Sequence, residues 1–374
     1  MIKKIFIIFC LITQVFISVA QKISSFPLNK VELLDGSAFY EAQQADMKYI
    51  LALDPDRLLA PYLKEASINP SKPNYPNWES MGLDGHTVGH YLSALSLMYA
   101  STGQKKLMER IQYVLKILDS CQIKNGDGYV GGVPDGKALW NDIRNGKIDA
   151  GSFSLGNRWV PFYNLHKLFA GLRDAYLYAG QSNALEILIK LTDWFYDLTK
   201  NLTDEQTQQI LKTEHGGLNE VFVNVSEITG NPKYLKLAER FSHRAILQPL
   251  IEKKDILTGL HANTQIPKVI GFKSYADATN NTQWDEAAKY FWDLVVNKYT
   301  ISIGGHGVRE HFISPNDFSS MIESNQGPET CNSYNMLKLT KLLFLSTSDT
   351  KYIDFMNVHY IIIFYPLLIV KKGD

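Results

Sequence analysis

The feature that most limits the fold is a recurring break between apolar helical segments. Short runs rich in Gly, Ser, Thr and Asn end one segment and precede the next, and three of them, at 178–182, 228–232 and 278–282, lie about fifty residues apart. These residue types suit the C-cap of one helix and the N-cap of the following helix. A helix–turn–helix unit repeated in this way cannot bury its apolar face alone, so neighbouring units must stack.

The segments between these breaks predict an all-α fold. Apolar residues recur at helical spacing, and no comparable set of alternating strands is present. The predicted helical ranges are 38–51, 56–64, 87–99, 106–120, 162–178, 185–198, 234–244, 284–298 and 332–345. Closing such a stack gives an (α/α) toroid, and an open superhelix is the structural alternative. Two long loops rich in Gly and polar residues, 126–160 and 300–328, are where a site is expected.

Composition limits the classes of partner. In 374 residues, 38 Lys+Arg balance 38 Asp+Glu, so no broad charged surface for nucleic acid or an acidic membrane is expected. Hydrophobic residues make up 45% of the chain, which suffices for a large core. The three cysteines, Cys10, Cys121 and Cys331, are too few for a disulfide-rich scaffold, and a single Cys121–Cys331 bridge remains open.

Residues 1–20 have the organisation of a secretory signal peptide. Lys3 and Lys4 precede an apolar stretch at 5–19, and the small residues ending at Ala20 form a cleavage site before Gln21. The stretch is shorter than the ~20 apolar residues of a comfortable membrane span. We therefore expect a secreted, periplasmic protein whose mature chain begins near Gln21 and has no membrane span.

Five histidines mark segment starts or loop edges. His86 and His90 lie one helical turn apart, and a packed, hydrogen-bonded pair is favoured over a metal pair because no Glu stands between them as in zincins. Each of His166, His215 and His261 alone suits a satisfied core histidine. In a toroid, however, the inner helices converge on one axis, so three imidazoles can surround a small ligand and hydrogen-bond its hydroxyl groups.

Two acidic motifs carry further chemistry. Glu310 follows the glycine-rich run 304–307, and it suits a general acid/base if its surroundings raise its pKa. The alternative is an exposed carboxylate paired with Arg309 or Lys298. Glu329 and Cys331 stand two residues apart at a helix start, where both can reach one metal ion; Zn²⁺ accepts both ligand types, but a tetrahedral site needs at least two more.

These motifs resemble the β-L-arabinofuranosidases of glycoside hydrolase families 127 and 146. The strings that carry the resemblance run in family order over roughly residues 30–350: LALDPDRLLA at 51–60, LDGHTVGHYL at 83–92, YNLHK at 163–167, HANTQIPK at 261–268, GGHGVREHF at 304–312 and GPETCN at 327–332. Several long strings in order are more specific than any one of them.

The resemblance implies a fold and a mechanism. The family fold is an (α/α)6 barrel followed by β-sandwich domains. The family mechanism is retaining hydrolysis by a zinc-bound cysteine nucleophile, with a glutamate as acid/base. Carried onto this chain, the resemblance assigns the acid/base to Glu310, zinc ligands to Glu329 and Cys331, and sugar contacts to His166, His215, His261 and Gln43.

The end of the chain departs from the family pattern. The family's remaining ligands are a Cys-Cys pair well downstream, one of which is the nucleophile, whereas no cysteine follows Cys331 here. Residues 356–374 form an aberrant apolar tail, for which we expect a frameshift or premature stop in the gene. The expectation is therefore a partial barrel over 21–355, without the family's β-sandwich domains and with an incomplete zinc site.

The leading prediction is an exported glycoside hydrolase that cleaves arabinose from plant glycans, with this chain by itself inactive or nearly so. Two alternatives stay open. One is an (α/α) toroid epimerase or lyase in which His166, His215 or His261 moves protons. The other is a sugar-binding remnant of a truncated gene without catalysis.

Overall fold

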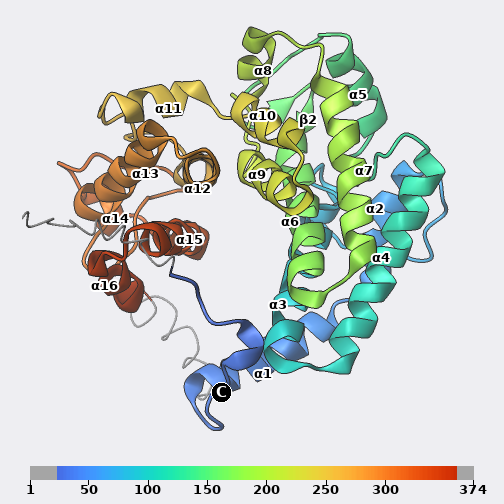
Figure 1. Ribbon diagram of the computed structural model, residues 1–374, viewed down its shortest axis with the longest axis horizontal. Coiled ribbons are helices and arrows are strands. Elements are labelled where there is room, and N and C mark those ends of the chain that lie inside the picture. Colours follow the sequence, from blue (N-terminus) through green and yellow to red (C-terminus); the bar gives the residue numbers. More distant parts are fainter. Residues whose placement is uncertain (1–22, 360–374) are drawn as a thin grey trace, which may run out of the picture.

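The structure, a computed structural model, describes residues 23–359 and forms a ring of helices in this range (Figure 1). The expected signal peptide at 1–20 and residues 360–374 of the expected tail lie outside the described residues, whereas 356–359 continue the last helix, α16 (Thr350–His359). The helices in chain order are α1 (Ala38–Ala52), α2 (Pro55–Glu65), α3 (His86–Thr102), α4 (Lys105–Asn125), α5 (Gly136–Arg144), α6 (Pro161–Ala179), α7 (Ser182–Thr199), α8 (Asp204–Ile210), α9 (Leu218–Thr229), α10 (Pro232–Arg240), α11 (Arg244–Ile251), α12 (Ala262–Thr279), α13 (Thr282–Leu294), α14 (Ser319–Glu323), α15 (Thr330–Thr347) and α16 (Thr350–His359).

The ring is built from helix pairs. The pairs α3/α4, α6/α7, α9/α10, α12/α13 and α15/α16 each pack together, preceded in the chain by α1 and α2. The first member of each pair also packs on the first member of the next, from α3 through α6, α9 and α12 to α15, and these helices form the inner wall (Figure 1). This arrangement confirms the predicted all-α toroid.

The turns between paired helices explain where each helix ends. Gly180 and Gly230 have positive φ angles of 66° and 68° at the ends of α6 and α9, and Asn280 takes a φ of 56° at the end of α12. Glycine adopts this left-handed conformation at little cost, and asparagine tolerates it. The side chains of Asn231 and Asn281 then cap the next helices, α10 and α13. The predicted breaks are therefore cap-to-cap turns.

Four predicted ranges differ from the structure, among them the loop 300–328, which contains the short helix α14. The range 234–244 is not one helix: α10 ends at Arg240, and α11 begins at Arg244, whose backbone N–H donates to Gln208 Oε1 at 2.8 Å and so receives a cap. The range 284–298 changes at Val295 into a π-helix, Val295–Tyr299. The loop 126–160 contains α5 and a two-stranded antiparallel hairpin, β1 (Ser154–Leu155) and β2 (Arg158–Trp159).

Two hydrophobic cores fill the ring. One core takes its residues mainly from α2 to α10, and the other takes its residues from α11 to α16. Cys121 is buried in the first core, and both Cys121 and Cys331 are free thiols, so the Cys121–Cys331 bridge is not formed. None of the helices in residues 23–359 has the length and apolar character that crossing a bilayer requires.

Candidate active site

The candidate site lies where the inner helices begin. The loops that precede α9, α12 and α15 carry His215, His261 and Glu329, and α6 carries His166 in its second turn. A hydrogen bond of 2.8 Å from Asn335 Nδ2 on α15 to Asn263 Oδ1 on α12 joins two of these helix starts. Because successive inner helices are separated by a returning outer helix, their N-termini meet at one end of the ring.

Glu310 lies at the tip of a tight turn. The backbone groups of Val308 and His311 exchange two hydrogen bonds, of 2.9 and 3.0 Å, and the two residues between them, Arg309 and Glu310, have φ angles of 48° and 68°. Two central residues with positive φ are the arrangement of a type I′ turn, which non-glycine residues adopt at a cost. The turn is fixed to α12 by a 2.7 Å bond from Ala262 N–H to the Glu310 carbonyl.

His261 orients the Glu310 carboxyl. The Thr264 backbone N–H donates to His261 Nδ1 at 3.2 Å, so in the neutral ring the proton lies on Nε2, which donates to Glu310 Oε2 at 3.2 Å. The Glu310 side chain remains 56% exposed and is therefore accessible to a ligand. Lys298, one alternative partner considered for Glu310, instead pairs with Asp255 at 2.6 Å.

His166 and His215 are both buried, and the loop that follows His215 passes close to the His166 ring. A Cβ on Gly216 would lie 2.3 Å from His166 Nδ1, so only glycine lets the loop after His215 pass this ring. Burial lowers the pKa of both imidazoles well below the usual 6.5, so both are neutral. Both His166 Nδ1 and His215 Nε2 are buried without a hydrogen-bond partner in the described part of the chain.

Three further polar side chains, which the sequence analysis did not assign, lie in this region. Burial raises the pKa of the Glu214 carboxyl, and the nearby charge of Glu310 adds to the increase. Burial lowers the pKa of the Lys167 ammonium to about 8, and its Nζ lies 4.4 Å from the centre of the Tyr163 ring. Cys331 lies within electrostatic range of both Tyr163 and Lys167, so the start of α15 is near the start of α6.

Glu329 and Cys331 lie side by side but do not make a complete metal site. The Cys331 thiol donates to Glu329 Oε2 at 3.4 Å. Burial, followed by the Glu329 charge, raises the thiol pKa to about 12. No group of three or more His, Cys, Asp and Glu side chains arranged to hold a metal occurs within residues 23–359. Two donors do not fit tetrahedral Zn²⁺, which takes four ligands.

His86 lies in a buried hydrogen-bonded network at the start of α3. His86 Nδ1 lies 2.8 Å from the Leu83 carbonyl and 2.7 Å from Glu79 Oε1, and Glu79 also accepts the backbone N–H groups of Gly85 and Thr87 at 2.8 and 2.9 Å. His90, one turn along α3, is exposed and makes no hydrogen bond to another described residue. The packed, hydrogen-bonded arrangement that was predicted for the pair therefore holds for His86, which anchors the start of α3, and not for His90.

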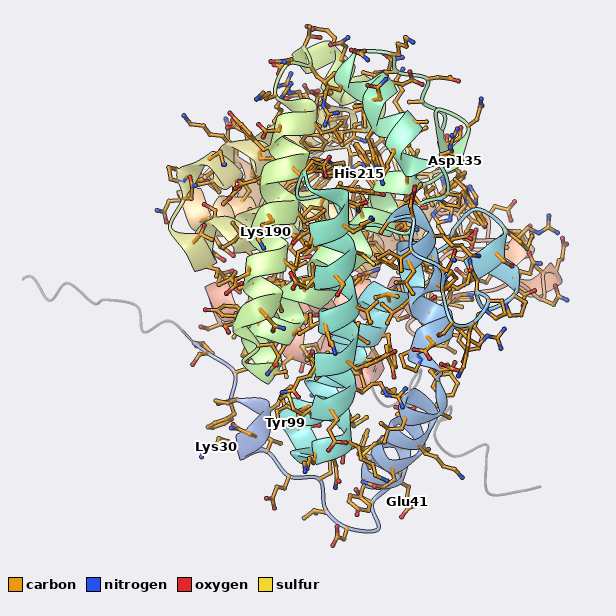
Figure 2. All side chains as sticks on the ribbon, turned by 90° about the vertical axis from the view of Figure 1, so that its right-hand side faces the viewer. Lys30, Glu41, Tyr99, Asp135, Lys190 and His215 are labelled. Atoms are coloured by element: carbon orange, nitrogen blue, oxygen red, sulfur yellow. The ribbon has the colours of Figure 1, made fainter. Side chains whose placement is uncertain are left out.

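Gln43 lies apart from the other predicted residues. Its Nε2 donates to Ser101 Oγ at 3.3 Å, near the C-terminal end of α3, whereas the site lies at the N-terminal ends of the inner helices. Figure 2 shows Glu41 and Tyr99 at one end of the molecule and His215 at the other. The structure thus gathers His166, His215, His261, Glu310 and the Glu329–Cys331 pair, and the role of Gln43 remains a prediction.

Comparisons with known proteins place this arrangement in a family. The family model described as the β-L-arabinofuranosidase GH127 catalytic domain matches residues 30–359. A GH127 β-L-arabinofuranosidase from Geobacillus stearothermophilus T6 has a similar structure, with a TM-score of 0.65 and 15% identity over 87% of this chain and 55% of that chain. A second solved GH127 β-arabinofuranosidase gives a TM-score of 0.63 and 20% identity over 89% of this chain and 53% of that chain.

The likeness to these solved structures, at 20% identity or less, is a likeness of fold. The chain spans about half the length of either solved relative. No curated protein matches the sequence significantly. The family match covers most of the chain, including the loops that carry His166, His261, Glu310 and Cys331. The chain therefore belongs to the family of GH127 β-L-arabinofuranosidase catalytic domains.

Proposed function

We propose that this chain carries the sugar-binding and acid/base side of an exported retaining glycoside hydrolase that removes L-arabinofuranose from plant glycans. The observation that carries the proposal is the 3.2 Å hydrogen bond between His261 Nε2 and Glu310 Oε2. It orients an accessible carboxyl within electrostatic range of Glu214, which precedes the buried His215 in the chain. Family membership supports the choice of sugar, and the signal at 1–20 supports export to the periplasm.

In the proposed reaction, Glu310 gives its proton to the leaving sugar oxygen and then takes a proton from the attacking water. His261 keeps the carboxyl oriented through both steps because its own tautomer is fixed by Thr264. His166, His215 and Glu214 bind hydroxyl groups of the furanose. Retaining hydrolysis also needs a nucleophile on the opposite side of the sugar, and we assign none among residues 23–359.

The proposal includes zinc only as an ion that Glu329 and Cys331 would bind. A carboxylate and a thiolate are both ligand types that Zn²⁺ accepts, but these two residues leave at least two positions to be filled. Zinc titration monitored with a chromophoric chelator tests this binding. We expect weak uptake that Cys331→Ser removes, and uptake that Cys331→Ser leaves unchanged would take Cys331 out of the ligand set.

The test of the function is hydrolysis of 4-nitrophenyl β-L-arabinofuranoside by the mature chain, with the product anomer recorded by proton NMR. Release of L-arabinose with retained configuration supports the proposal, provided that Glu310→Gln lowers kcat about 100-fold or more. Full activity of Glu310→Gln would remove Glu310 from the reaction. An epimerised or unsaturated product would instead favour proton transfer by one of the histidines.

A sugar-binding protein without catalysis is the second candidate. The observation that favours it is the pair of metal donors without a third ligand in the described part of the chain. Binding of L-arabinose by calorimetry, with no release of 4-nitrophenol from the substrate above, would support this candidate and overturn the hydrolase assignment for this chain.

A further inference from the structure

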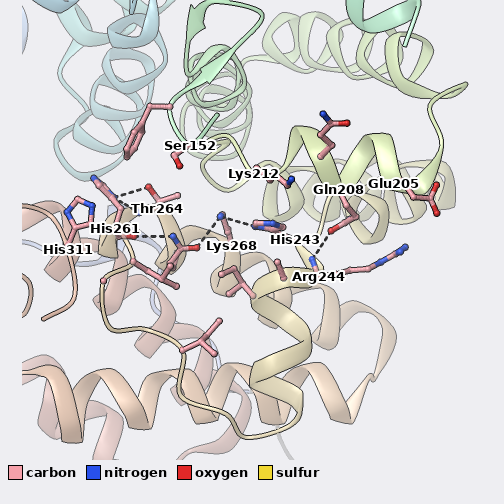
Figure 3. A pocket seen from close by; sticks show the side chains of 18 residues that line it. Ser152, Glu205, Gln208, Lys212, His243, Arg244, His261, Thr264, Lys268 and His311 are labelled. Carbon is pink, nitrogen blue, oxygen red and sulfur yellow. Dashed lines mark hydrogen bonds between the residues drawn. The ribbon is translucent and has the colours of Figure 1, made fainter. Parts of the chain in front are cut away.

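A cavity of about 950 Å³ opens beside the His261–Glu310 pair. Its lining runs from His261 and His311, past Lys268 and His243, to Arg244 (Figure 3). Since His261 donates to the Glu310 carboxyl, a molecule in this cavity lies next to the proposed acid/base. The position is suited to the part of a substrate that leaves when the arabinose bond is cleaved.

The middle of the cavity offers hydrogen-bond donors without partners. Lys268 is only 2% exposed. Its Nζ contacts Gln265 Oε1 and His243 Nδ1, each at 3.1 Å. An ammonium carries three N–H groups, so one remains for a ligand. Because His243 Nδ1 accepts from Lys268, the ring proton lies on Nε2, which no hydrogen bond joins to another described residue. Lys268 therefore offers one donor to the cavity, and His243 Nε2, on the opposite side of the imidazole ring, is a separate second donor.

The charges around the cavity favour an anion. Lys212, Arg244 and Lys268 line it, against one carboxylate, Glu205. Arg244 is already paired with Asp204 at 3.1 Å, whereas Lys212 makes no ion pair with a residue of the described range. The Phe153 ring, 39% exposed, packs against His261 at 5.3 Å between ring centres and offers an apolar face to a sugar ring.

We propose that this cavity is a subsite for a carboxylate-bearing sugar on the leaving-group side of the cleaved bond. Lys268 donates to the carboxylate, Lys212 adds attraction at the rim, and Phe153 supports the ring. The proposal rests on the glycosidase function proposed above. A carboxylate accepts from the unused N–H of Lys268, and charge-assisted hydrogen bonds of this kind are the stronger ones.

The ionisation of Lys268 gives the subsite a pH dependence. Burial lowers the pKa of Lys268 to about 7, and the Glu214 charge opposes this decrease. His215 and His243 also face the amine, and burial lowers their pKa values so far that both stay neutral. A bound carboxylate favours the charged ammonium, so binding takes up a proton, and the affinity should fall as the pH rises through 7.

Calorimetry of the mature chain with D-galacturonate and with its neutral counterpart D-galactose tests the proposal. We expect galacturonate to bind at least five-fold more tightly at pH 6 and the preference to shrink at pH 8.5. Equal affinity for the two sugars at pH 6 would overturn the proposal. Inorganic phosphate is the third ligand, and phosphate that binds as tightly as galacturonate and displaces it would show a bare-anion site instead.

Three lysine variants test whether the preference for galacturonate over galactose arises in this cavity. Lys268→Met should abolish it, and Lys212→Met, an exposed change at the rim that leaves the core intact, should lower it at least two-fold. Lys190→Met on the outer helix α7 is the matched control and should leave the preference unchanged. A preference that survives both cavity variants, or that is lost in the control, contradicts the assignment.

Glu310→Gln separates the subsite from the proposed function. The variant should lose hydrolysis and keep the preference for galacturonate. If the wild type binds galacturonate preferentially but releases no arabinose, the hydrolase proposal fails and the anion subsite stands. If the wild type hydrolyses the neutral substrate without any preference for galacturonate, the subsite fails and the hydrolase proposal stands.

Discussion

Burial sets the protonation states of several side chains around the candidate site. It holds His166 and His215 neutral, raises the pKa of Glu214, and lowers the pKa values of Lys167 and Lys268 to about 8 and about 7. Neutral imidazoles exchange hydrogen bonds with sugar hydroxyls at a smaller desolvation cost than charged groups. His166 and His215 therefore suit the hydroxyl groups of a sugar, whereas Lys268, whose charge changes near pH 7, suits an anionic group.

The low pKa of Lys268 predicts how stability varies with pH. Between about pH 7 and the usual lysine pKa near 10.4, the unfolded chain binds a proton at this side chain and the folded chain does not. The free energy of unfolding should therefore rise with pH in this window, by at most about 1.4 kcal/mol per pH unit, from this residue. Urea titrations at pH 6 to 9 should show that wild type gains stability relative to Lys268→Met as the pH rises. A difference between the two that is independent of pH contradicts the assigned pKa.

For single residues, the sequence predicted which types of residue form the site, but it did not predict the complete set of site residues. His166, His215, His261 and Glu310 stand at loop edges or helix starts, where a pattern is visible. Lys268 lies inside α12 and Lys167 inside α6, where a lysine in sequence looks like a solvated side chain. Only the packing of a helix that is covered on all sides shows that these amines are buried.

Among the helices, α3 and α6 pack most closely because each contributes a glycine that faces the backbone of the other helix. A Cβ on Gly89 would lie 2.0 Å from the Lys167 carbonyl, and a Cβ on Gly171 would lie 2.5 Å from the Gly89 carbonyl oxygen. Neither backbone can move aside without separating the helices. The close contact positions His166 and Lys167 against the start of α3.

Gly89→Ala should therefore destabilise the fold by about 3 kcal/mol, at the upper end of the cost of overpacking a core. Thermal unfolding followed by circular dichroism measures the change. Gly327→Ala is the control, since a Cβ at Gly327 meets nothing within 4 Å, and it should leave the melting temperature nearly unchanged. An equal effect of the two variants would contradict the close approach of α3 and α6.

The start of α3 offers a second prediction for a single element. Glu79 accepts two backbone N–H groups and contacts the His86 ring, and all of these groups are buried. Glu79→Ala should cost about 2–4 kcal/mol, because it leaves buried donors unpaired. Glu109→Ala, which removes a surface partner of Lys105 on α4, should cost less than about 0.5 kcal/mol. Chemical denaturation distinguishes the two, and comparable losses would mean that Glu79 does not anchor the helix.

Most of the longer helices were predictable from sequence, including the inner helices α3, α6 and α15, but the inner helices α9 and α12 were not among the predicted ranges. The range 185–198 is amphipathic and corresponds to α7 within a few residues. The inner helix α12 has buried residues on every side, including Gln265, Lys268 and Lys273, so it lacks the alternation of faces that marks a helix in sequence. The break between α10 and α11 depends on Gln208, a residue distant in sequence that caps α11.

For the stability of the whole molecule, the contacts between the two halves of the ring, each with its own hydrophobic core, are the most important. Between the halves, Lys338 on α15 contacts Glu220 on α9 at 2.6 Å, and Arg173 on α6 reaches the same carboxylate at 3.5 Å. Glu220 is buried, so its charge depends on these two cations. This network joins helices from the two halves of the ring beneath the candidate site.

Loss of one cation from this network should loosen the ring. Lys338→Met should destabilise the protein by about 1–3 kcal/mol, because the buried Glu220 charge then depends on Arg173 alone. Hydrogen exchange should increase along α9 and α15. Lys341→Met, an exposed change one turn along the same helix, should alter neither quantity. Unchanged exchange in Lys338→Met would show that the two halves are held by apolar packing alone.

The ring itself followed from the repeat of capped helix pairs, since such units must stack to bury their faces. The sequence did not reveal which ends of the inner helices meet, and this is what brings His261, Glu310 and Cys331 into one region. That convergence is the central claim, and the dissociation constant for L-arabinose tests it most directly. The account predicts that His261→Ala weakens binding at least ten-fold, while Glu41→Gln at the far end of the ring (Figure 2) leaves it unchanged. Unaltered affinity in His261→Ala, or a ten-fold loss in Glu41→Gln, would contradict it.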